Sequence, residues 1–429
     1  MGTLNLISGL KLLFLASLSL LLGGCVKATL AWADLSPKGA PATPTILDVP
    51  SNEDPKTWWE DKGKAFAREQ LQAHVFGYLP DDAAITVLRH DVLDEAVFGG
   101  RGTLEEYVVR ATATFNGEAV EARQFLINIV IPNQRVGPAP VILLENFSPR
   151  WVAIRHPKIT RPSGTSDGMG GIGGGIAQFI FGRYVATPPT ADILDRGYAL
   201  AVMYPSEIVP DSARAGLTAL NQLAVGHQDD ATRWGAIAAW GWTFSRAIDV
   251  LDRDERVLRD GFITYGHSRY GKAALLAGAF DDRVAAVISH QSGTGGASLN
   301  RRKKGESIKE ITDSYPHWFA PQYASYAGRE GEMPIDQHYL LALLAPRPVL
   351  LGNARRDVWS DPNGALKAAI GADPVYKLYD PAAGLRQRRL KPFMPEASLS
   401  LWMRPGTHGV VKEDWPAFLD FLDAHFDER

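Results

Sequence analysis

The sequence predicts an α/β fold, a three-layer sandwich in which helices cover both faces of a mostly parallel central sheet. From about residue 198 onward, apolar stretches of strand length alternate with helical patterns, as expected for parallel strands joined by crossover helices. The apolar stretch 140–145 is typical of a strand buried on both faces. Between 84 and 131 the pattern has a period of two, which indicates antiparallel N-terminal strands at the front edge of the sheet.

The individual elements follow from these periods. Apolar residues at helical spacing predict a helix over 57–76, ended by the turn at 77–80, with an apolar stripe of Trp58, Ala65, Leu71 and Phe76. The other predicted helices are 234–252, the segment after residue 268, and 412–427. The predicted strands are 85–88, 107–113, 125–131, 140–145, 198–203, the segment from 262, 284–289, 348–352 and 399–403.

The irregular stretch 146–190 contains a glycine-rich run at 168–175. A phosphate-binding loop would place its glycines directly between a strand and a helix, with an acidic residue about twenty positions later. This run lacks that context, so we interpret it as a flexible surface insertion.

The first 25 residues have the features of an export signal, because Lys11 precedes an apolar run too short to span a bilayer. Two processing sites are open. The run at 22–25 resembles a lipoprotein box that would lipidate Cys25, the only cysteine, whereas 31–33 resembles an ordinary cleavage site. We expect residues 26–50 to be a linker and 51–429 a single catalytic domain. The protein would be an outer-membrane lipoprotein, or periplasmic or secreted, in a bacterium.

Composition excludes several classes of function. The chain has 429 residues, 45% of them hydrophobic, and a net charge of −3, which gives no basis for binding nucleic acid or an anionic membrane surface. Its ten histidines show neither the H-x-x-x-H nor the H-E-x-x-H spacing of helical zinc sites, so we expect no metal and no cofactor. We expect a monomer whose one membrane contact would be a lipid anchor. The basic run at 301–304 is either an anion site or a solvated loop.

The turn around Ser268 has the form of a nucleophile elbow. An apolar strand pattern from 262 breaks at Gly266 and resumes as an Ala/Leu-rich helix, which would lift the Ser268 hydroxyl clear of the sheet. The backbone N–H of Arg269 would then lie at a helix N-terminus, where it can bind a developing oxyanion. The motif reads G-x-S-x-x-G, with Gly271 one place later than in the common pattern.

A serine nucleophile needs a base and an acid, which in an α/β-hydrolase follow it in the order acid, then histidine. His408 follows the last predicted strand and precedes the final helix, so we predict that it is the base. Asp357 follows the strand at 348–352 and is the predicted acid. Asp361 is the nearby competitor, but its position before Pro362 favours a structural role in a turn.

These residues resemble motifs of the glucuronoyl esterases, carbohydrate esterase family 15, in the α/β-hydrolase superfamily. The run at 266–272 is similar to the family motif G-x-S-R-x-G-K, which also explains the displaced glycine. Further similar blocks are Ser-Gly-Thr-Gly-Gly-Ala at 292–297, with Arg301, Arg302, Gly305 and Glu306 behind it, Pro-His-Trp-Phe at 316–319, Asp-Val-Trp-Ser-Asp-Pro at 357–362 and Gly-Thr-His-Gly at 406–409. The resemblance is strong over about 230–425 and loose before it.

The resemblance implies a reaction and a substrate. Such enzymes cleave the ester between glucuronic acid on xylan and an alcohol of lignin, so the implied partners are glucuronoxylan and lignin–carbohydrate esters. It implies that the side chain of Arg269 joins the oxyanion hole. It also implies that the glucuronoyl hydroxyls bind Lys272, Glu306 and Trp359.

The sequence departs from the family pattern at Gln291. Some members take the triad acid from this position as a glutamate, and an amide cannot supply that negative charge. Other, mainly bacterial, members use an aspartate after the later strand, which Asp357 matches. Two rival readings of the chain stay open: an acetyl-xylan or general carboxylesterase on the same fold, and an inactive exported glycan-binding protein.

Overall fold

The computed structural model describes residues 49–162, 167, 174–224, 229–301, 304–387 and 389–426. The predicted export signal with Cys25, the cleavage site at 31–33 and most of the predicted linker lie outside these residues, as does most of the glycine-rich run. Within the described residues, no helix combines the length and the apolar character that a bilayer crossing requires.

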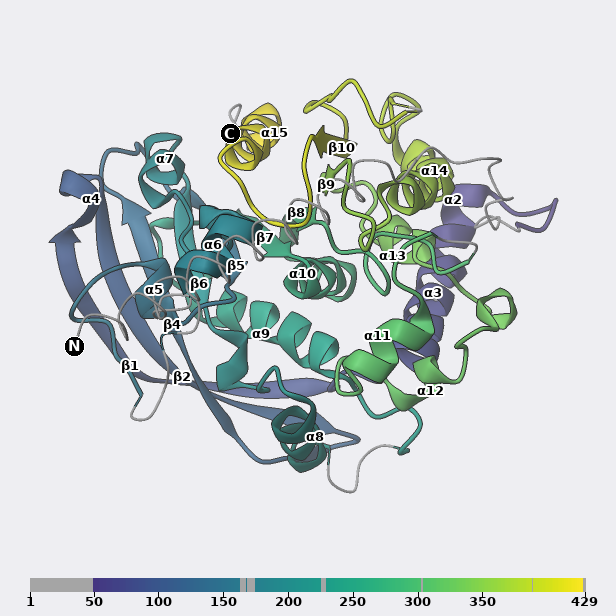
Figure 1. Ribbon diagram of the computed structural model, residues 1–429, viewed down its shortest axis with the longest axis horizontal. Coiled ribbons are helices and arrows are strands. Elements are labelled where there is room, and N and C mark those ends of the chain that lie inside the picture. Colours follow the sequence, from purple (N-terminus) through teal and green to yellow (C-terminus); the bar gives the residue numbers. More distant parts are fainter. Residues whose placement is uncertain are drawn as a thin grey trace, which may run out of the picture.

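One sheet of ten strands organises the molecule (Figure 1). Nine strands lie in the order β1-β2-β4-β6-β5-β7-β8-β9-β10, and β3 pairs with β2 beside this path. The strands are β1 (Asp82–Ala96), β2 (Gly102–Phe115), β3 (Glu118–Ala119), β4 (Arg123–Pro132), β5 (Ala139–Glu145), β6 (Ala199–Met203), β7 (Val257–His267), β8 (Val284–His290), β9 (Val349–Ala354) and β10 (Leu399–Arg404).

The sheet is mixed in the way that the sequence predicts. The pairs from β1 through β2 and β4 to β6 are antiparallel, whereas every pair from β6 through β5 to β10 is parallel. Strand β5 lies in the middle of the order and is buried along its whole length. Its side chains alternate, since Val141 and Leu143 belong to one hydrophobic cluster while Ile142 and Leu144 belong to the other.

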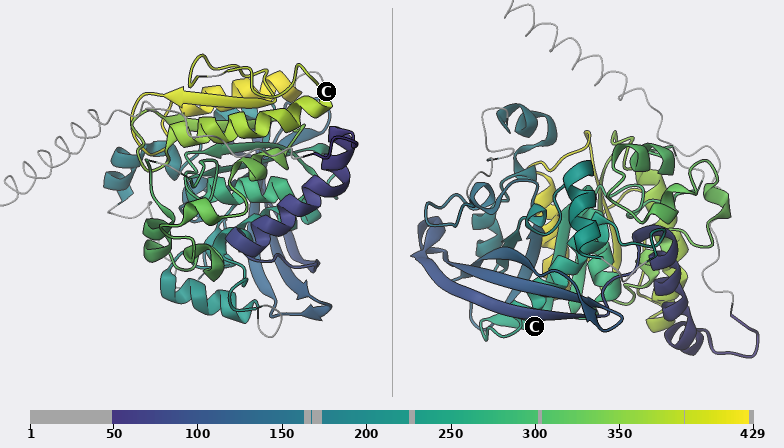
Figure 2. Two further views of the ribbon diagram at one scale, coloured as in Figure 1. Left: turned by 90° about the vertical axis from the view of Figure 1, so that its right-hand side faces the viewer. Right: turned by 90° about the horizontal axis from the view of Figure 1, so that it is seen from below.

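Helices cover both faces of the sheet (Figures 1 and 2). The larger cluster holds residues of α9 (Ala236–Leu251), α10 (Arg269–Phe280), α13 (His338–Ala342) and α14 (Pro362–Tyr379). The opposite cluster holds residues of α7 (Thr190–Asp195) and α15 (Asp414–Phe426). The remaining helices are α2 (Pro55–Trp58), α3 (Lys64–Leu71), α4 (Val97–Gly100), α5 (Arg150–Ala153), α6 (Gly174–Phe181), α8 (Ala213–Gln222), α11 (Ile308–Ser314) and α12 (Pro321–Ala324), with 3-10 turns at Arg183–Val185, Pro205–Glu207 and Glu330–Glu332.

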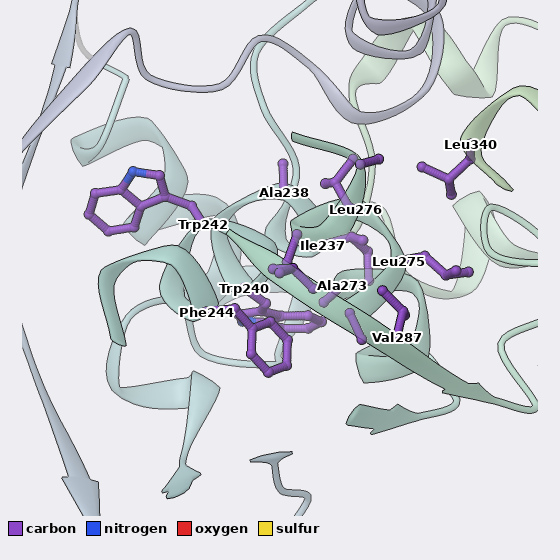
Figure 3. Close-up of a cluster of buried hydrophobic side chains, with 14 of the residues drawn as sticks. Ile237, Ala238, Trp240, Trp242, Phe244, Ala273, Leu275, Leu276, Val287 and Leu340 are labelled. Atoms are coloured by element: carbon purple, nitrogen blue, oxygen red, sulfur yellow. The ribbon is translucent and has the colours of Figure 1, made fainter. Parts of the chain in front are cut away.

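The core under α10 anchors the element that carries Ser268. Figure 3 shows Trp240 and Phe244 of α9 near Ala273 of α10 and Val287 of β8, all of them fully or almost fully buried. Burying an aromatic or aliphatic side chain of this size stabilises the fold by about 1.5–3 kcal/mol. The start of α10 is therefore packed on a rigid core, which helps to hold Ser268 in the backbone conformation described below.

The predicted helix over 57–76 is present, and Leu71 and Phe76 are buried as predicted, but the rest of its buried face differs from the prediction. Two π-helical stretches, Trp59–Gly63 and Gln72–Phe76, flank α3, and the helix ends at Gly77 with φ +82°. The buried residues recur every four positions, at Trp59, Gly63, Ala67, Leu71 and Val75. The wider π turns bring residues four apart into line, so Ala65 is exposed and Trp58 only half-buried.

The described parts of the stretch 146–190 are more ordered than the sequence indicates. They form α5, α6, a 3-10 turn and the start of α7. Arg150 of α5 is fully buried, and its guanidinium donates to Asn128 of β4 at 2.6 Å and to Glu207 at 2.8 Å. This ion pair and hydrogen bond fasten the start of the insertion to the sheet.

Candidate active site

The predicted catalytic residues meet because they follow adjacent parallel strands. Ser268 comes after β7, Gln291 after β8, Asp357 shortly after β9 and His408 shortly after β10. These four strands are neighbours in the sheet, and the ends of parallel strands lie at the same edge. Residues that are 23 to 140 positions apart in the sequence are thereby brought onto neighbouring loops.

Ser268 adopts the strained conformation of a nucleophile elbow. Its φ of +56° and ψ of −120° are unusual for a residue with a side chain, and its N–H donates to the His290 carbonyl oxygen at 2.8 Å. Ser268 is the N-cap residue of α10, yet its side chain makes no capping hydrogen bond. No capping bond therefore ties the hydroxyl to the helix end, and Ser268 lines the cavity described below.

The two glycines of the elbow are required by close backbone approaches. A Cβ added at Gly266 would lie 2.0 Å from the carbonyl oxygen of Tyr270, a severe clash with backbone. A Cβ at Gly271 would lie 3.0 Å from the carbonyl oxygen of Gly266 and 3.2 Å from that of His290. The displaced second glycine thus still permits close packing of α10 on β7 and β8.

His408 is held by Asp357. The Nδ1 atom of His408 lies 2.7 Å from Oδ2 of Asp357, whose side chain is only 2% exposed. The backbone N–H of Ser360 donates to Asp357 Oδ1 at 3.2 Å, and its hydroxyl donates to Oδ2 at 2.5 Å. Burial opposes ionisation of Asp357, but the charge of His408 and these hydrogen bonds outweigh it and lower its pKa.

Two aromatic side chains pack in succession next to the imidazole of His408. The ring of His267 lies 4.6 Å from it between centroids, and Phe147 packs on His267 at 5.7 Å. Burial, followed by the charges of His408 and His290, lowers the pKa of His267 well below its usual value. The buried ring of His267 therefore packs against the imidazole of His408.

The predicted site residues surround one cavity of about 640 Å³. Ser268, Arg269, Lys272, Glu306, Trp359 and His408 all line it. Asp357 is buried behind His408 and reaches the cavity through that ring. Asp361 lies elsewhere, as the N-cap of α14, where its carboxylate accepts the Gly364 N–H at 3.0 Å. Its structural role was predicted from the proline that follows it.

The guanidinium of Arg269 is fixed by an ion pair and by aromatic faces. Its Nη1 donates to Oδ2 of Asp211. Its Cζ lies 4.8 Å from the ring centroid of Trp318, 5.2 Å from Phe147 and 5.6 Å from Tyr315. A cation on the cavity wall is thereby held in one place by groups of the protein itself.

Asp211 is a site residue that sequence reasoning missed. Its Oδ1 accepts hydrogen bonds from His317 Nε2 at 3.1 Å and Trp318 Nε1 at 2.9 Å. Burial raises its pKa, but these bonds and the charge of Arg269 reverse that effect, so the pKa is lowered. The block Pro-His-Trp-Phe at 316–319, noted in the sequence, is thus explained as the support of this carboxylate.

Lys272 and the segment after β8 are joined at the cavity floor. Lys272 is 4% exposed, and its ammonium donates to the carbonyl oxygens of Ser292 and, at 2.7 Å, Thr294. A buried ammonium needs such partners because desolvation is costly. Lys272 therefore positions the Ser-Gly-Thr segment as well as facing the cavity.

Trp359 lies on the rim, with 68% of its surface exposed. Its ring centroid is 6.5 Å from that of His408. Glu306 is half-buried on the same cavity, and its backbone N–H donates to the Trp359 carbonyl oxygen at 3.4 Å. An exposed tryptophan beside an imidazole offers a flat apolar face to any ligand that enters the cavity.

Together these groups have the chemistry of acyl transfer. A serine hydroxyl on an elbow, an imidazole paired with a carboxylate and a fixed guanidinium line or adjoin one cavity. Among the described residues, no group of three or more His, Cys, Asp or Glu side chains is arranged to hold a metal ion.

Sequence comparison places these features in a known group. Residues 227–380 match the family model described as glucuronyl esterase, fungi. A curated carbohydrate esterase, MZ0003 from an unknown prokaryotic organism, is 31% identical over 380 residues, which cover 86% of this chain and 85% of that protein. A 4-O-methyl-glucuronoyl methylesterase from Phanerochaete carnosa is 28% identical over 44% of this chain and 53% of that protein.

Comparison with solved structures gives the same family as the sequence comparison. The glucuronoyl esterase from Solibacter usitatus superposes with a TM-score of 0.74 at 30% identity, covering 90% of this chain and 99% of that one. A promiscuous esterase of carbohydrate esterase family 15 from a marine bacterial metagenome gives 0.76 at 29% identity, covering 92% and 99%. The α/β-hydrolase fold predicted from the sequence is thereby confirmed. The chain belongs to the glucuronoyl esterases of carbohydrate esterase family 15, and it is a carboxylic ester hydrolase.

Proposed function

We propose that this protein hydrolyses esters of glucuronic acid through a Ser268–His408–Asp357 triad. His408 takes the proton of the Ser268 hydroxyl as its oxygen attacks the ester carbonyl, and Asp357 stabilises the imidazolium that forms. Collapse of the tetrahedral intermediate expels the alcohol, which receives that proton from His408. Water, activated by the neutral His408, then attacks the acyl-enzyme and releases glucuronate. The 2.7 Å contact between His408 and Asp357, on the cavity that Ser268 lines, is the observation that carries this proposal.

Arg269 would stabilise the oxyanion of both tetrahedral intermediates. The backbone N–H of Arg269, at the start of α10, would supply one donor, and its guanidinium would add a fixed positive charge. The ion pair with Asp211 supports this role, because a preorganised cation needs no reorientation as charge develops.

Lys272, Glu306 and Trp359 would bind the glucuronoyl group, as the family resemblance implies. All three line the cavity, which combines charged groups with an exposed indole face. Sugars bind well to such surfaces, because their hydroxyls form hydrogen bonds while their C–H faces pack on aromatic rings. We propose the (4-O-methyl-)glucuronic acid side group of xylan as the acyl part.

An aromatic alcohol of lignin would be the leaving group. Phe181, the last residue of α6, lines the cavity together with Phe147 and Val185. With Trp359 on the rim, the cavity therefore has apolar groups near its mouth. Such groups favour an aryl alcohol over a small polar one.

A wider ester range is the second candidate. One relative of similar fold and 29% identity is described as a promiscuous esterase. The same triad and oxyanion donors would then serve acetyl-xylan or simple carboxylic esters.

The substrate range is tested with benzyl glucuronate, an acetylated xylose and an aryl acetate, each assayed with the wild type and with Ser268→Ala. The proposal predicts a kcat/KM for benzyl glucuronate at least about 100-fold above that for either acetate. Comparable rates for all three esters, lost in Ser268→Ala, would favour the promiscuous candidate instead.

Export belongs to the same proposal, with 1–25 as signal, 26–50 as linker and 51–429 as one catalytic domain. Expression in a Gram-negative bacterium tests the processing site. A wild type found in membranes and a Cys25→Ser variant found in the soluble periplasmic fraction would support lipidation. Equal release of both would support cleavage after Ala33.

A further inference from the structure

Gln291 occupies the position at which, as the family resemblance implies, some members carry the triad acid, and its side chain is engaged elsewhere. It follows β8 directly, is 2% exposed and has a φ of +52°. A left-handed backbone in a residue with a side chain costs about 1 kcal/mol or more, so the surrounding structure must hold it there.

The amide of Gln291 bonds to the backbone on both sides of His408. Its Oε1 accepts the N–H of Gly409 at 2.8 Å, and its Nε2 donates to the carbonyl oxygen of Thr407 at 3.3 Å. One bond needs an acceptor and the other a donor. An amide provides both, whereas an ionised glutamate would provide acceptors only and would face the Thr407 carbonyl with a repelling oxygen.

Arg404 also binds the loop of His408, through two backbone carbonyl oxygens. Its Nη2 donates to the carbonyl oxygens of Thr407 at 3.0 Å and Gly409 at 2.7 Å, and its Nε donates to Asp414. Arg404 can bind only acceptors, so the Gly409 N–H depends on Gln291. The two side chains share the Thr407 carbonyl oxygen, and Gln291 in addition accepts the Gly409 N–H.

The backbone of Gln291 contacts residues that surround Asp357, the partner of His408. Its N–H donates to the carbonyl oxygen of Gly352 in β9 at 2.8 Å, and its own carbonyl oxygen lies 3.0 Å from the hydroxyl of Ser360. That hydroxyl is also 2.5 Å from Asp357 Oδ2. Residue 291 therefore contacts both the loop of His408 and the residue that supports Asp357.

We propose that Gln291 is a positioning residue, whose amide fixes the loop of His408 and thereby the hydrogen bond between His408 and Asp357. This inference rests on the proposed triad. It gives a role to the glutamine that stands where the family resemblance implies a glutamate in some members. When Asp357 supplies the acid, an amide at 291 serves better than a carboxylate, because it can both donate and accept a hydrogen bond.

Two variants test the role. Gln291→Met keeps the length of the side chain and removes both hydrogen bonds. Gln291→Glu keeps the acceptor and loses the donor while it is ionised. Gln337→Met is the matched control, because Gln337 is another fully buried glutamine, outside the cavity. Steady-state kinetics on benzyl glucuronate, or on the best ester found, are measured with thermal unfolding of each variant.

For Gln291→Met we expect kcat to fall about 10- to 100-fold with KM changed less than about threefold, since a base displaced by a fraction of an ångström loses rate more than binding. Gln337→Met should retain the wild-type kcat. A merely structural Gln291 would lower the unfolding temperature and leave the kcat of the folded enzyme unchanged, which would overturn the proposal.

The pH dependence of Gln291→Glu gives an independent readout, which remains informative if Gln291→Met fails to fold. A protonated glutamate regains the donor for Thr407, so the activity of this variant relative to the wild type should rise as pH falls. A ratio that is flat, or that rises with pH because the carboxylate serves as an acid, contradicts the inference.

The controls separate this inference from the function on which it rests. If Ser268→Ala and His408→Ala retain activity, the triad itself is wrong. If they lose activity while Gln291→Met and Gln291→Glu match the wild type at every pH, the triad stands and only the role of Gln291 falls.

Discussion

His408 Nδ1 and Asp357 Oδ2 lie 2.7 Å apart, and Asp357 is buried behind the imidazole. This contact fixes which ring nitrogen faces the carboxylate, so the other nitrogen, Nε2, is available for the role of base that we propose. A neutral isostere at 357 would keep the shape of the contact and remove its charge.

Asp357→Asn should therefore lower kcat by about 10⁴-fold with little change in KM, as expected when the acid of such a triad is replaced by an amide. Steady-state kinetics on benzyl glucuronate check this. Asp361→Asn is the matched control, because Asp361 caps α14 and does not contact His408. A fall of less than tenfold in Asp357→Asn would mean that another group supplies the acid.

The stability of the same pair should depend on pH. The pKa of Asp357 is lowered in the folded protein, so its ionised form stabilises the fold above the unfolded pKa near 3.8, and this contribution is lost as pH falls through the folded value. Denaturant unfolding of the wild type and Asp357→Asn between pH 3 and 7 should show a difference in free energy that is constant above about pH 5 and shrinks below it. A constant difference down to pH 3 would contradict the ionised pair.

Asp211→Asn should lower kcat about tenfold or more, because the variant keeps an oxygen for Trp318 but loses the ion pair that orients Arg269. KM should change little, since the oxyanion exists only in the transition state. Asp420→Asn breaks an exposed ion pair with Arg196 far from the cavity and serves as control. Equal kinetics of the two variants would show that the aromatic faces alone hold Arg269.

Trp359→Ala should weaken catalysis on the sugar ester without weakening the fold. The side chain is 68% exposed, so the free energy of unfolding should change by less than about 0.5 kcal/mol. We expect kcat/KM for benzyl glucuronate to fall about tenfold. Hydrolysis of a small aryl acetate should be much less affected. Val136→Ala, at a site 97% exposed and outside the cavity, is the control.

Gly266→Ala should cost more than Gly271→Ala. The added methyl would meet backbone at 2.0 Å in the first and at 3.0 Å in the second. We expect Gly266→Ala to lose about 2 kcal/mol or more of unfolding free energy, as overpacking against rigid atoms does. Denaturant titration of both variants measures this order, and the reverse order would contradict the geometry of the elbow.

The proposed triad could be predicted from local patterns, because each of its three residues follows a recognisable strand. Ser268, Asp357 and His408 were found by their places after successive apolar runs, and the fold places those strand ends side by side. Asp211 could not be found in this way. It lies 58 residues before Arg269, in a loop with no motif of its own, and only the tertiary fold joins the two.

The helix at 57–76 illustrates a second limit. The period of 3.6 gave the right element and placed Leu71 and Phe76 correctly on its buried face, but not Ala65. The π turns, which no simple residue pattern marks, shift the alignment to every fourth residue. Likewise, the sequence indicated that Gln291 could not be an acid, but the bonds to Thr407 and Gly409 depend on loops that meet only in the folded chain.

The most direct test of the account is the rate of Ser268→Ala on benzyl glucuronate, with thermal unfolding recorded for both proteins. The account predicts a fall in kcat/KM of at least about 10³-fold. It also predicts that the variant unfolds at a temperature close to the wild type and still binds the ester. A folded Ser268→Ala that works within tenfold of the wild type would contradict nucleophilic attack by Ser268.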